Sequence, residues 1–257
     1  MSDQPLTAPK LIPAATVVIF RHCPAGGPPQ LLMVQRSREM RFAGGAAVFP
    51  GGKIDAADDA LAAKLDADAD LGELAARIAA IRETLEETGL AIGLSRPVSA
   101  AEAAQARMHL LEQGALAPVL ERFDWSLATE QLVPFARWCP MRDRSFDTRF
   151  YLTDLGTGAV DIAIDATENT HLFWASAAAT LELADRGEVS VIFPTRRNLD
   201  RLAQFASFAQ ARAQAEAIPV RMISPSQKII DGAPWLTIPD DMGYPVTGQP
   251  MSTVKRG

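Results

Sequence analysis

Two spacings of apolar and polar residues run through this chain. Residues 14–21 (AATVVIFR) and 30–36 (QLLMVQR) are apolar runs typical of strands, and the Gly- and Pro-containing segment 22–29 separates them. This pattern predicts neighbouring strands joined by a loop. Further along, apolar residues recur at the three- and four-residue spacing of a helix that packs one face on a core. These residues are Leu71, Leu74, Ile78, Ile81 and Leu85.

The same criteria predict helices and strands in the rest of the chain. The predicted helices cover residues 99–113, 116–122, 175–186 and 194–211, the last beginning at a proline. The predicted strands cover residues 132–139, 146–155 and 170–174. From Ser224 onward the chain is rich in Pro and Gly, and two roles stay open for this tail: packing on the domain or forming a homodimer contact.

Three carboxylates lie on one face of the last turn of the helix that carries Leu85. Glu83, Glu86 and Glu87 are spaced i, i+3 and i+4, and Gly89 can adopt the left-handed conformation that ends a helix. Carboxylates at a helix C-terminus oppose the macrodipole, and each like-charge pair costs about 0.2–0.5 kcal/mol. A divalent cation held by oxygen ligands would offset this repulsion. A solvated acidic helix end is the alternative.

An apolar strand that enters a Gly-Gly turn precedes this helix. The run Val48 to Asp55 (VFPGGKID) contains Gly51 and Gly52, and glycine lets the backbone approach a ligand closely. The segment 36–52 is also rich in arginine and glycine. Arginine offers paired donors to phosphate oxygens, so a phosphate-binding loop and a simple solvated loop are both open.

The turn and the acidic helix together resemble the signature of the Nudix hydrolases, G-x5-E-x7-R-E-U-x-E-E-x-G-U, where U is aliphatic. The matching residues are Gly52, Arg82, Glu83, Glu86, Glu87, Gly89 and Leu90. Three departures stand out. Asp58 occupies the place of the first glutamate, with Glu73 as the alternative; Thr84 occupies an aliphatic position; and a 23-residue spacer, 59–81, replaces seven residues. We predict a loop followed by a helix extension in this spacer, with 59–70 a dispensable surface excursion.

A second pattern resembles the coenzyme A diphosphatase branch of that family, L-L-T-x-R-[S/A]-x3-R-x3-G-x3-F-P-G-G. The matching residues are Arg36, Ser37, Arg41, Gly45, Phe49, Pro50, Gly51 and Gly52, while the threonine is absent. Residues 146–150 (FDTRF) are similar to a run in a longer, peroxisomal-type branch whose members also carry inserts inside the Nudix box. Ser145 departs from that run, which has arginine there.

The resemblance implies an α/β Nudix fold, a mixed curved sheet sandwiched between helices, with a box insert and extra C-terminal helices. We expect one enlarged domain over residues 1–257, with a core at about 12–210 and an extension at 211–257 that packs on it. The length of 257 residues is sufficient for such a domain.

The resemblance also implies the chemistry. Glu83, Glu86 and Glu87 would hold Mg²⁺ or Mn²⁺ with the carbonyl of Gly52, and Arg82 would orient these carboxylates. The substrate contacts implied are Arg36, Arg41, Gly45, Gly51 and Arg149. The reaction implied is hydrolysis of coenzyme A or acyl-coenzyme A to adenosine 3′,5′-bisphosphate and 4′-phosphopantetheine. Hydrolysis of NADH, a nucleotide sugar or a dinucleoside polyphosphate is one alternative, and a non-catalytic nucleotide sensor is another.

The amino-acid composition limits the class of protein, its partners and its compartment. Hydrophobic content of 48% with 22% charged residues is ordinary for a globular protein, and a net charge of -6 argues against a nucleic-acid partner. Cys23 and Cys139 are far apart and indicate no disulfide framework. The sequence has neither an apolar run of 18 residues nor a signal peptide. We therefore expect a cytoplasmic protein with a small-molecule nucleoside diphosphate substrate and no membrane partner.

Overall fold

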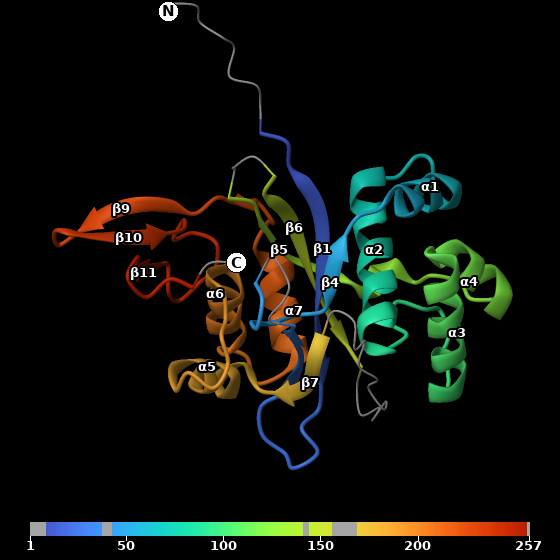
Figure 1. Cartoon of the computed structure of the whole chain (residues 1–257), viewed down its shortest axis with the longest axis horizontal. Coiled ribbons are helices and arrows are strands. Elements are labelled where there is room, and N and C mark those ends of the chain that lie inside the picture. The colour runs from blue at the N-terminus through green and yellow to red at the C-terminus, as the bar shows by residue number, and fades with distance from the viewer. Residues whose placement is uncertain (1–8, 38–42, 141–143, 156–168, 256–257) are drawn as a thin grey trace, which may run out of the picture.

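The computed structural model describes residues 9–37, 43–140, 144–155 and 169–255. Figure 1 shows a central sheet with α1 to α4 on one side and α5 to α7 on the other. Each face of the sheet carries its own apolar core, one including Val17 and Ile78 and the other including Val18 and Phe135. The predicted mixed α/β fold with helices on both faces is therefore confirmed.

The sheet is mixed, and its strands lie in the order β3-β2-β1-β6-β5-β8, with β4 paired to β1 and β7 paired to β2. The bounds of these strands are β1 Ile12–Arg21, β2 Gln30–Arg36, β3 Ala47–Val48, β4 Gly51–Lys53, β5 Val133–Trp138, β6 Phe146–Asp154, β7 Asn169–Ala175 and β8 Met222–Ile223. Strand β1 lies at the centre and pairs in parallel with β6 along nearly its whole length. Residues 17–20 of β1 are all buried, because helices cover both faces of the sheet there. The five predicted strands are confirmed, with ends shifted by at most a few residues.

The first helical layer contains α1 Ala56–Leu65, α2 Leu71–Thr88, α3 Ala100–Gln113 and α4 Leu116–Phe123. Helix α2 begins at Asp70, whose side chain accepts a hydrogen bond from the Glu73 N–H, and ends at Gly89 with a left-handed φ of 74°. Of its predicted apolar stripe, Ile78, Ile81 and Leu85 are buried and Leu74 is half-buried, whereas Leu71 is exposed. That residue is 40% exposed, because it begins the helix next to the end of α1.

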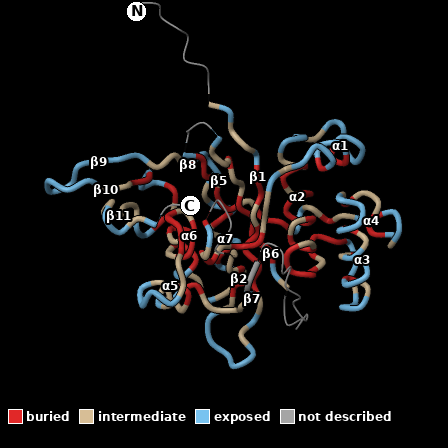
Figure 2. The backbone as a smooth tube through the Cα atoms, viewed as in Figure 1, coloured by how far each residue is buried: buried red, intermediate tan, exposed pale blue. Residues whose placement is uncertain are grey.

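The spacer before α2 differs from our prediction. Residues 56–65 form α1 instead of a loop, and two of its side chains, Leu61 and Ala62, are buried in the core beneath. Figure 2 shows the outer side of this helix exposed and its inner side buried. The prediction that residues 59–70 are only a surface excursion is therefore wrong, because Leu61 and Ala62 pack in the core. That these residues are dispensable stays a prediction.

The second helical layer contains α5 Ala177–Asp185, α6 Phe193–Leu202 and α7 Phe208–Ala217. The single helix predicted at 194–211 is wrong, since it divides into α6 and α7. Ser207 starts the second helix by accepting a hydrogen bond from the Gln210 N–H. The break lets the ring of Phe208 pack edge-on against Phe20 of the sheet, with centroids 5.4 Å apart.

The tail forms a separate three-stranded sheet of β9 Ser226–Ile230, β10 Ala233–Thr237 and β11 Gly248–Pro250. Its hairpin projects away from the body of the protein (Figure 1). Tyr244 attaches the tail to the domain by packing edge-on against Trp138 and by donating a hydrogen bond to Asn198. The boundary that we drew at residue 210 falls inside α7, and the division into core and extension stays a prediction.

Candidate active site

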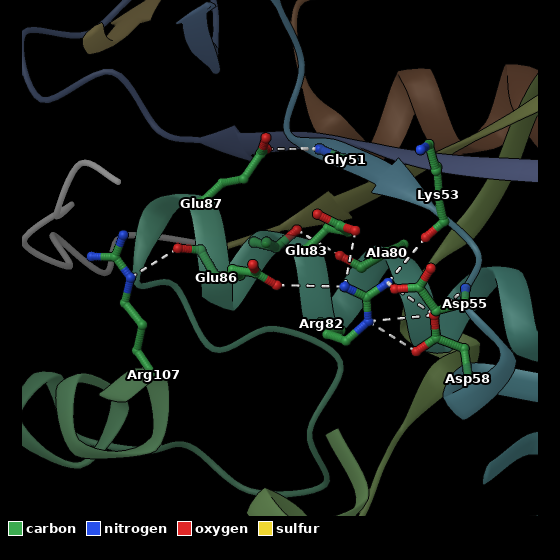
Figure 3. Close-up of polar contacts among 11 residues, drawn as sticks. Gly51, Lys53, Asp55, Asp58, Ala80, Arg82, Glu83, Glu86, Glu87 and Arg107 are labelled. Atoms are coloured by element: carbon green, nitrogen blue, oxygen red, sulfur yellow. Dashed lines mark hydrogen bonds and ion pairs between the residues drawn. The ribbon is translucent and has the colours of Figure 1, made fainter. Parts of the chain in front are cut away.

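The predicted Gly-Gly turn is instead the start of strand β4, which lies directly against the acidic end of α2 (Figure 3). The Gly51 N–H donates a 3.0 Å hydrogen bond to Glu87 Oε2. Gly51 has a φ of 152°, and a methyl group there would overlap the backbone of Ala15, so only glycine fits. A methyl group on Gly52 would overlap the carboxyl group of Glu83. Gly51 therefore lets β4 approach β1 closely, and Gly52 leaves the space in which the Glu83 carboxyl group lies.

Arg82 lies at the centre of the polar contacts in Figure 3. Its Nε donates to Asp58 Oδ1 at 3.0 Å, and its Nη2 donates to Asp58 Oδ2 at 2.9 Å and to the Lys53 carbonyl at 3.0 Å. Its Nη1 donates to Glu83 Oε1 at 2.9 Å. The side chains of Arg82 and Asp58 are only 5% and 1% exposed. One buried guanidinium thus connects the first turn of α1, β4 and the acidic turn of α2.

Burial and the contacts around Arg82 shift the pKa values of both Arg82 and Glu83. Burial alone would lower the pKa of Arg82, but its hydrogen bonds to Asp58 and the charges of Glu83, Asp58 and Asp55 outweigh it, so the pKa rises above its ordinary value. Burial raises the pKa of Glu83 to about 7, with Glu86 adding to the rise and Arg82 opposing it. Arg82 is therefore a permanent cation, and the charge of Glu83 changes near neutral pH.

A second arginine supports the acidic turn from another helix. Arg107 of α3 donates from Nε to the backbone carbonyl of Glu86 at 2.9 Å. Its positive charge lies at the C-terminal end of α2, where it compensates the helix dipole. The sequence predicts a positive charge near this helix end but does not identify Arg107, because no motif connects α3 with α2.

The structure brings together six of the predicted site residues, namely Gly51, Gly52, Arg82, Glu83, Glu86 and Glu87. Asp58 and Glu73, the two candidates for the first glutamate of the box, differ in their contacts, and which of them replaces that glutamate stays a prediction. Asp58 pairs with Arg82, whereas Glu73 pairs with Arg77 at 3.1 Å and with Arg149 at 3.4 Å.

Arg149 is therefore not brought to the acidic cluster. Its partner Glu73 lies about 20 Å from Glu86 along α2, at roughly 1.5 Å per residue. Two other predicted substrate contacts, Arg36 and Gly45, are hydrogen-bonded to each other, since the Gly45 N–H donates to the Arg36 carbonyl at 3.2 Å. Arg41 lies outside the described residues. The substrate roles of all four residues stay predictions.

The donor set suits a hard divalent cation, because carboxylate oxygens are the ligands such ions prefer. Within the described ranges, however, no three His, Cys, Asp or Glu side chains lie close enough together to hold an ion. Arg82 Nη1 lies between two of the carboxylates, 2.9 Å from Glu83 and 3.5 Å from Glu86. The Glu86 side chain is 36% exposed, so it has room to rotate toward its neighbours. Glu83, Glu86 and Glu87 are thus the residues that would hold a cation.

Comparisons with known proteins agree with this geometry. A family model described as the NUDIX domain matches residues 11–143, a range that includes β4 and all of α2. No curated protein matches this chain in sequence. Over the described residues, no helix is long and apolar enough to cross a membrane.

Solved structures are also similar. A NUDIX hydrolase from Alicyclobacillus acidocaldarius is 26% identical with a TM-score of 0.65, and the match covers 80% of this chain and 96% of that one. DR0079 from Deinococcus radiodurans is 15% identical with a TM-score of 0.41, covering 79% and 89%. An Ap4A hydrolase from C. elegans is 18% identical with a TM-score of 0.38, covering 69% and 89%. Of these three, the Alicyclobacillus protein is similar enough to support a shared fold.

Proposed function

Since this chain belongs to the NUDIX domain family and is a Nudix-type hydrolase, we propose that it cleaves the diphosphate of coenzyme A or of an acyl-coenzyme A. The family acts on nucleoside diphosphate derivatives and generally uses divalent metal ions. The products would be adenosine 3′,5′-bisphosphate and 4′-phosphopantetheine or its acyl form. We further propose that α1 is an insert inside the Nudix box, as in the branch that the sequence resembles.

The observation that carries this proposal is the spacing of basic residues before the two glycines of β4. Arg36, Arg41 and Gly45 precede Gly51 and Gly52 at the intervals of the coenzyme A pattern. Gly45, which donates a hydrogen bond to the Arg36 carbonyl, leads through β3 to β4, whose glycines lie against the acidic cluster. A basic loop at this position would lie beside a diphosphate held at the cluster.

Mg²⁺ or Mn²⁺, bound by Glu83, Glu86 and Glu87, would lower the pKa of a water molecule and neutralise charge on the phosphoryl oxygens. The chain itself holds these carboxylates in place. Arg82 fixes Glu83 by a hydrogen bond, and Asp58 in turn fixes Arg82. Such support of the ligands by further buried groups keeps a site in its productive geometry.

Other contacts support the remaining two glutamates, Glu86 and Glu87. The Gly51 N–H fixes one carboxylate oxygen of Glu87, and Arg107 holds the backbone carbonyl of Glu86. Strand β4 thus positions the Glu87 carboxylate, and α3 holds the backbone at Glu86. Glu83 is positioned by Arg82 of its own helix, which Asp58 of α1 holds in turn. We propose Arg82, Glu83, Glu86 and Glu87 as the catalytic set.

Coenzyme A differs from NADH and nucleotide sugars by its ribose 3′-phosphate, so discrimination requires donors for one additional anion. A hydrogen bond between charged groups contributes about 1.5–3 kcal/mol, which corresponds to one to two decades in specificity. Arginine is suited to this task because its planar fork matches phosphate oxygens. We assign the role to Arg41, with Arg36 as its neighbour.

The experiment is a turnover assay with Mg²⁺ or Mn²⁺ on coenzyme A, dephospho-coenzyme A, NADH, a nucleotide sugar and a dinucleoside polyphosphate. Arg41→Ala should lower kcat/KM for coenzyme A about ten- to a hundredfold more than for dephospho-coenzyme A. Arg122→Ala, an exposed arginine on α4, is the matched control and should change neither. Efficient cleavage of NADH or a nucleotide sugar with coenzyme A untouched would refute the substrate proposal. Binding without turnover of any compound would instead indicate a nucleotide sensor.

We also propose a cellular compartment and a homodimer contact for this chain. In the described part of the chain, Cys23 and Cys139 form no disulfide, which supports a reducing compartment such as the cytoplasm. The tail hairpin carries Ile229 at 73% exposure, which supports a homodimer contact there. Size-exclusion chromatography with light scattering on the chain and on Ile229→Lys would test the second proposal.

A further inference from the structure

Residues 43–46 form a tight turn that holds the backbone of Arg36. Within the turn, the Ala46 N–H donates to the Ala43 carbonyl at 3.0 Å. The Arg36 N–H donates to the Ala46 carbonyl at 3.0 Å, and the Gly45 N–H donates to the Arg36 carbonyl at 3.2 Å. The place of Arg36 at the end of β2 therefore depends on the place of this turn.

The turn contains a residue in an unfavourable backbone conformation. Ala43 has a φ of 51°, in the left-handed region that disfavours residues with a Cβ atom. A residue other than glycine keeps such a conformation only where the surrounding structure holds it there. Ala43 is buried, with 5% of its surface exposed. Packing around Ala43, and not its own backbone preference, therefore fixes the turn.

The segment 190–193, which leads into α6, supplies this packing. Ser190 forms a parallel β-bridge with Ala46. Ile192 forms a small apolar cluster with Ala43 and Ala46, separate from the two main cores. Because the other two buried members of this cluster are alanines, Ile192 supplies most of the apolar contact surface against the turn.

The main core and the tail hold this segment in turn. Val191 and Phe193 pack in the core on the α6 side of the sheet. The Phe193 N–H donates to the Lys255 carbonyl at 3.2 Å. Arg197, one turn further along α6, donates from Nη1 to the Gly248 carbonyl at 3.2 Å. The segment therefore connects α6 and the tail with the turn beside Arg36.

The side chain of Arg36 has a donor that the protein does not use. Over the described part of the chain, its buried Nε atom has no hydrogen-bond partner. A buried donor without an acceptor is costly, so an oxygen of a bound phosphate group would gain from meeting it. Such a hydrogen bond requires the guanidinium to be held in one place, which makes the backbone position of Arg36 important for affinity.

We propose that Ile192 is a positioning residue for Arg36, so that α6 and the tail contribute to substrate affinity through the 43–46 turn. This inference rests on the substrate role proposed above for Arg36. It adds a residue outside the matched range 11–143 to those that determine affinity. Ile192 holds the turn, the turn holds the Arg36 backbone, and the Arg36 guanidinium meets the substrate.

The test measures KM and kcat of Ile192→Ala on each diphosphate that the wild-type chain cleaves, or Kd for a compound that binds without turnover. KM or Kd should rise about tenfold, as for the loss of one charge-assisted hydrogen bond. The value of kcat should stay within about twofold, because binding is weakened without a change in the chemical step. Ile192→Val keeps most of the contact and should restore KM to within about threefold of the wild type.

Val191→Ala is the matched control, because Val191 is the next residue, is equally buried and packs in the main core instead of against the turn. It should lower Tm about as much as Ile192→Ala does and leave KM unchanged. An unchanged KM in Ile192→Ala, or an equal rise in both variants, would overturn the inference. Ile192→Thr carries the same test if Ile192→Ala does not fold.

A double mutant separates failure of this inference from failure of the substrate proposal. If Ile192 acts through Arg36, Ile192→Ala should raise KM no further in an Arg36→Ala background. An equal rise in both backgrounds would overturn the inference and leave the role of Arg36 intact. If Arg36→Ala alone leaves KM unchanged for every diphosphate cleaved, the substrate role of Arg36 fails, and the inference fails with it.

Discussion

Asp58→Asn tests the contact on which the acidic cluster depends. Asp58 and Arg82 are joined by hydrogen bonds of 2.9 and 3.0 Å, and both side chains are almost fully buried. Breaking a buried ion pair by changing one partner costs about 3–5 kcal/mol. Arg82 keeps its contact with Glu83, and asparagine keeps one acceptor oxygen, so we expect the lower end, about 3 kcal/mol. In a chain of this size that lowers Tm by roughly 6–12 °C.

The assay is urea unfolding followed by far-UV circular dichroism, together with kcat on whichever substrate the turnover panel identifies. Asp59→Asn is the matched control, because Asp59 lies in the same first turn of α1 but is exposed. The control should change stability by less than about 0.5 kcal/mol. A double-mutant cycle with Arg82→Gln should give a coupling energy of about 1–3 kcal/mol. Equal stability of the Asp58 and Asp59 variants would refute the positioning role of Asp58.

Three further predictions concern the acidic turn. Glu86→Gln and Glu87→Gln should each lower kcat by several orders of magnitude with an unchanged circular dichroism spectrum, and near-wild-type turnover in both would contradict the metal site. In EDTA, the raised pKa of Glu83 means that the folded protein binds this proton more tightly than the unfolded chain does. Stability should therefore fall by about 3 kcal/mol as pH rises from 4.5 to about 7, and Glu83→Gln should remove this part of the profile. Gly52→Ala should displace the Glu83 carboxyl group and abolish turnover. Gly72→Ala is the control and should leave kcat unchanged, because a methyl group fits there in the first turn of α2. Equal kcat in the two variants would contradict the close approach of Gly52 to Glu83.

Local signals were enough to predict most elements of the fold. Strands β1 and β2 follow from apolar runs bounded by turn residues, and α2 follows from its apolar stripe with Gly89 as its end. The grouping of Glu83, Glu86 and Glu87 on one face follows from the 3.6-residue period alone. These features depend on residues within a few positions of one another, so they are visible in sequence.

Helix α1 was not predicted from local hydrophobic spacing. Its ten residues are mostly Ala and Asp, and the hydrophobic spacing is too weak to indicate a packed helix. A local signal was present nonetheless, because Asp55 and Asp58 stand at the start of an alanine-rich run. In the structure the Asp55 N–H donates to the Asp58 side chain at 2.9 Å and so caps the helix. The burial of Leu61 depends on the core beneath, which no local pattern describes.

The contacts that make the cluster a site were decided by tertiary structure. Arg82 meets Asp58 across 24 positions, Gly51 meets Glu87 across 36, and Arg107 meets Glu86 across 21. Arg149, by contrast, is carried by β6 to the opposite end of α2. The amino-acid sequence determined which side chains share a helix face, because helix geometry repeats at a fixed interval. Which distant segments meet that face depends on how strands and helices pack, and packing energies are sums over contacts that spacing does not encode.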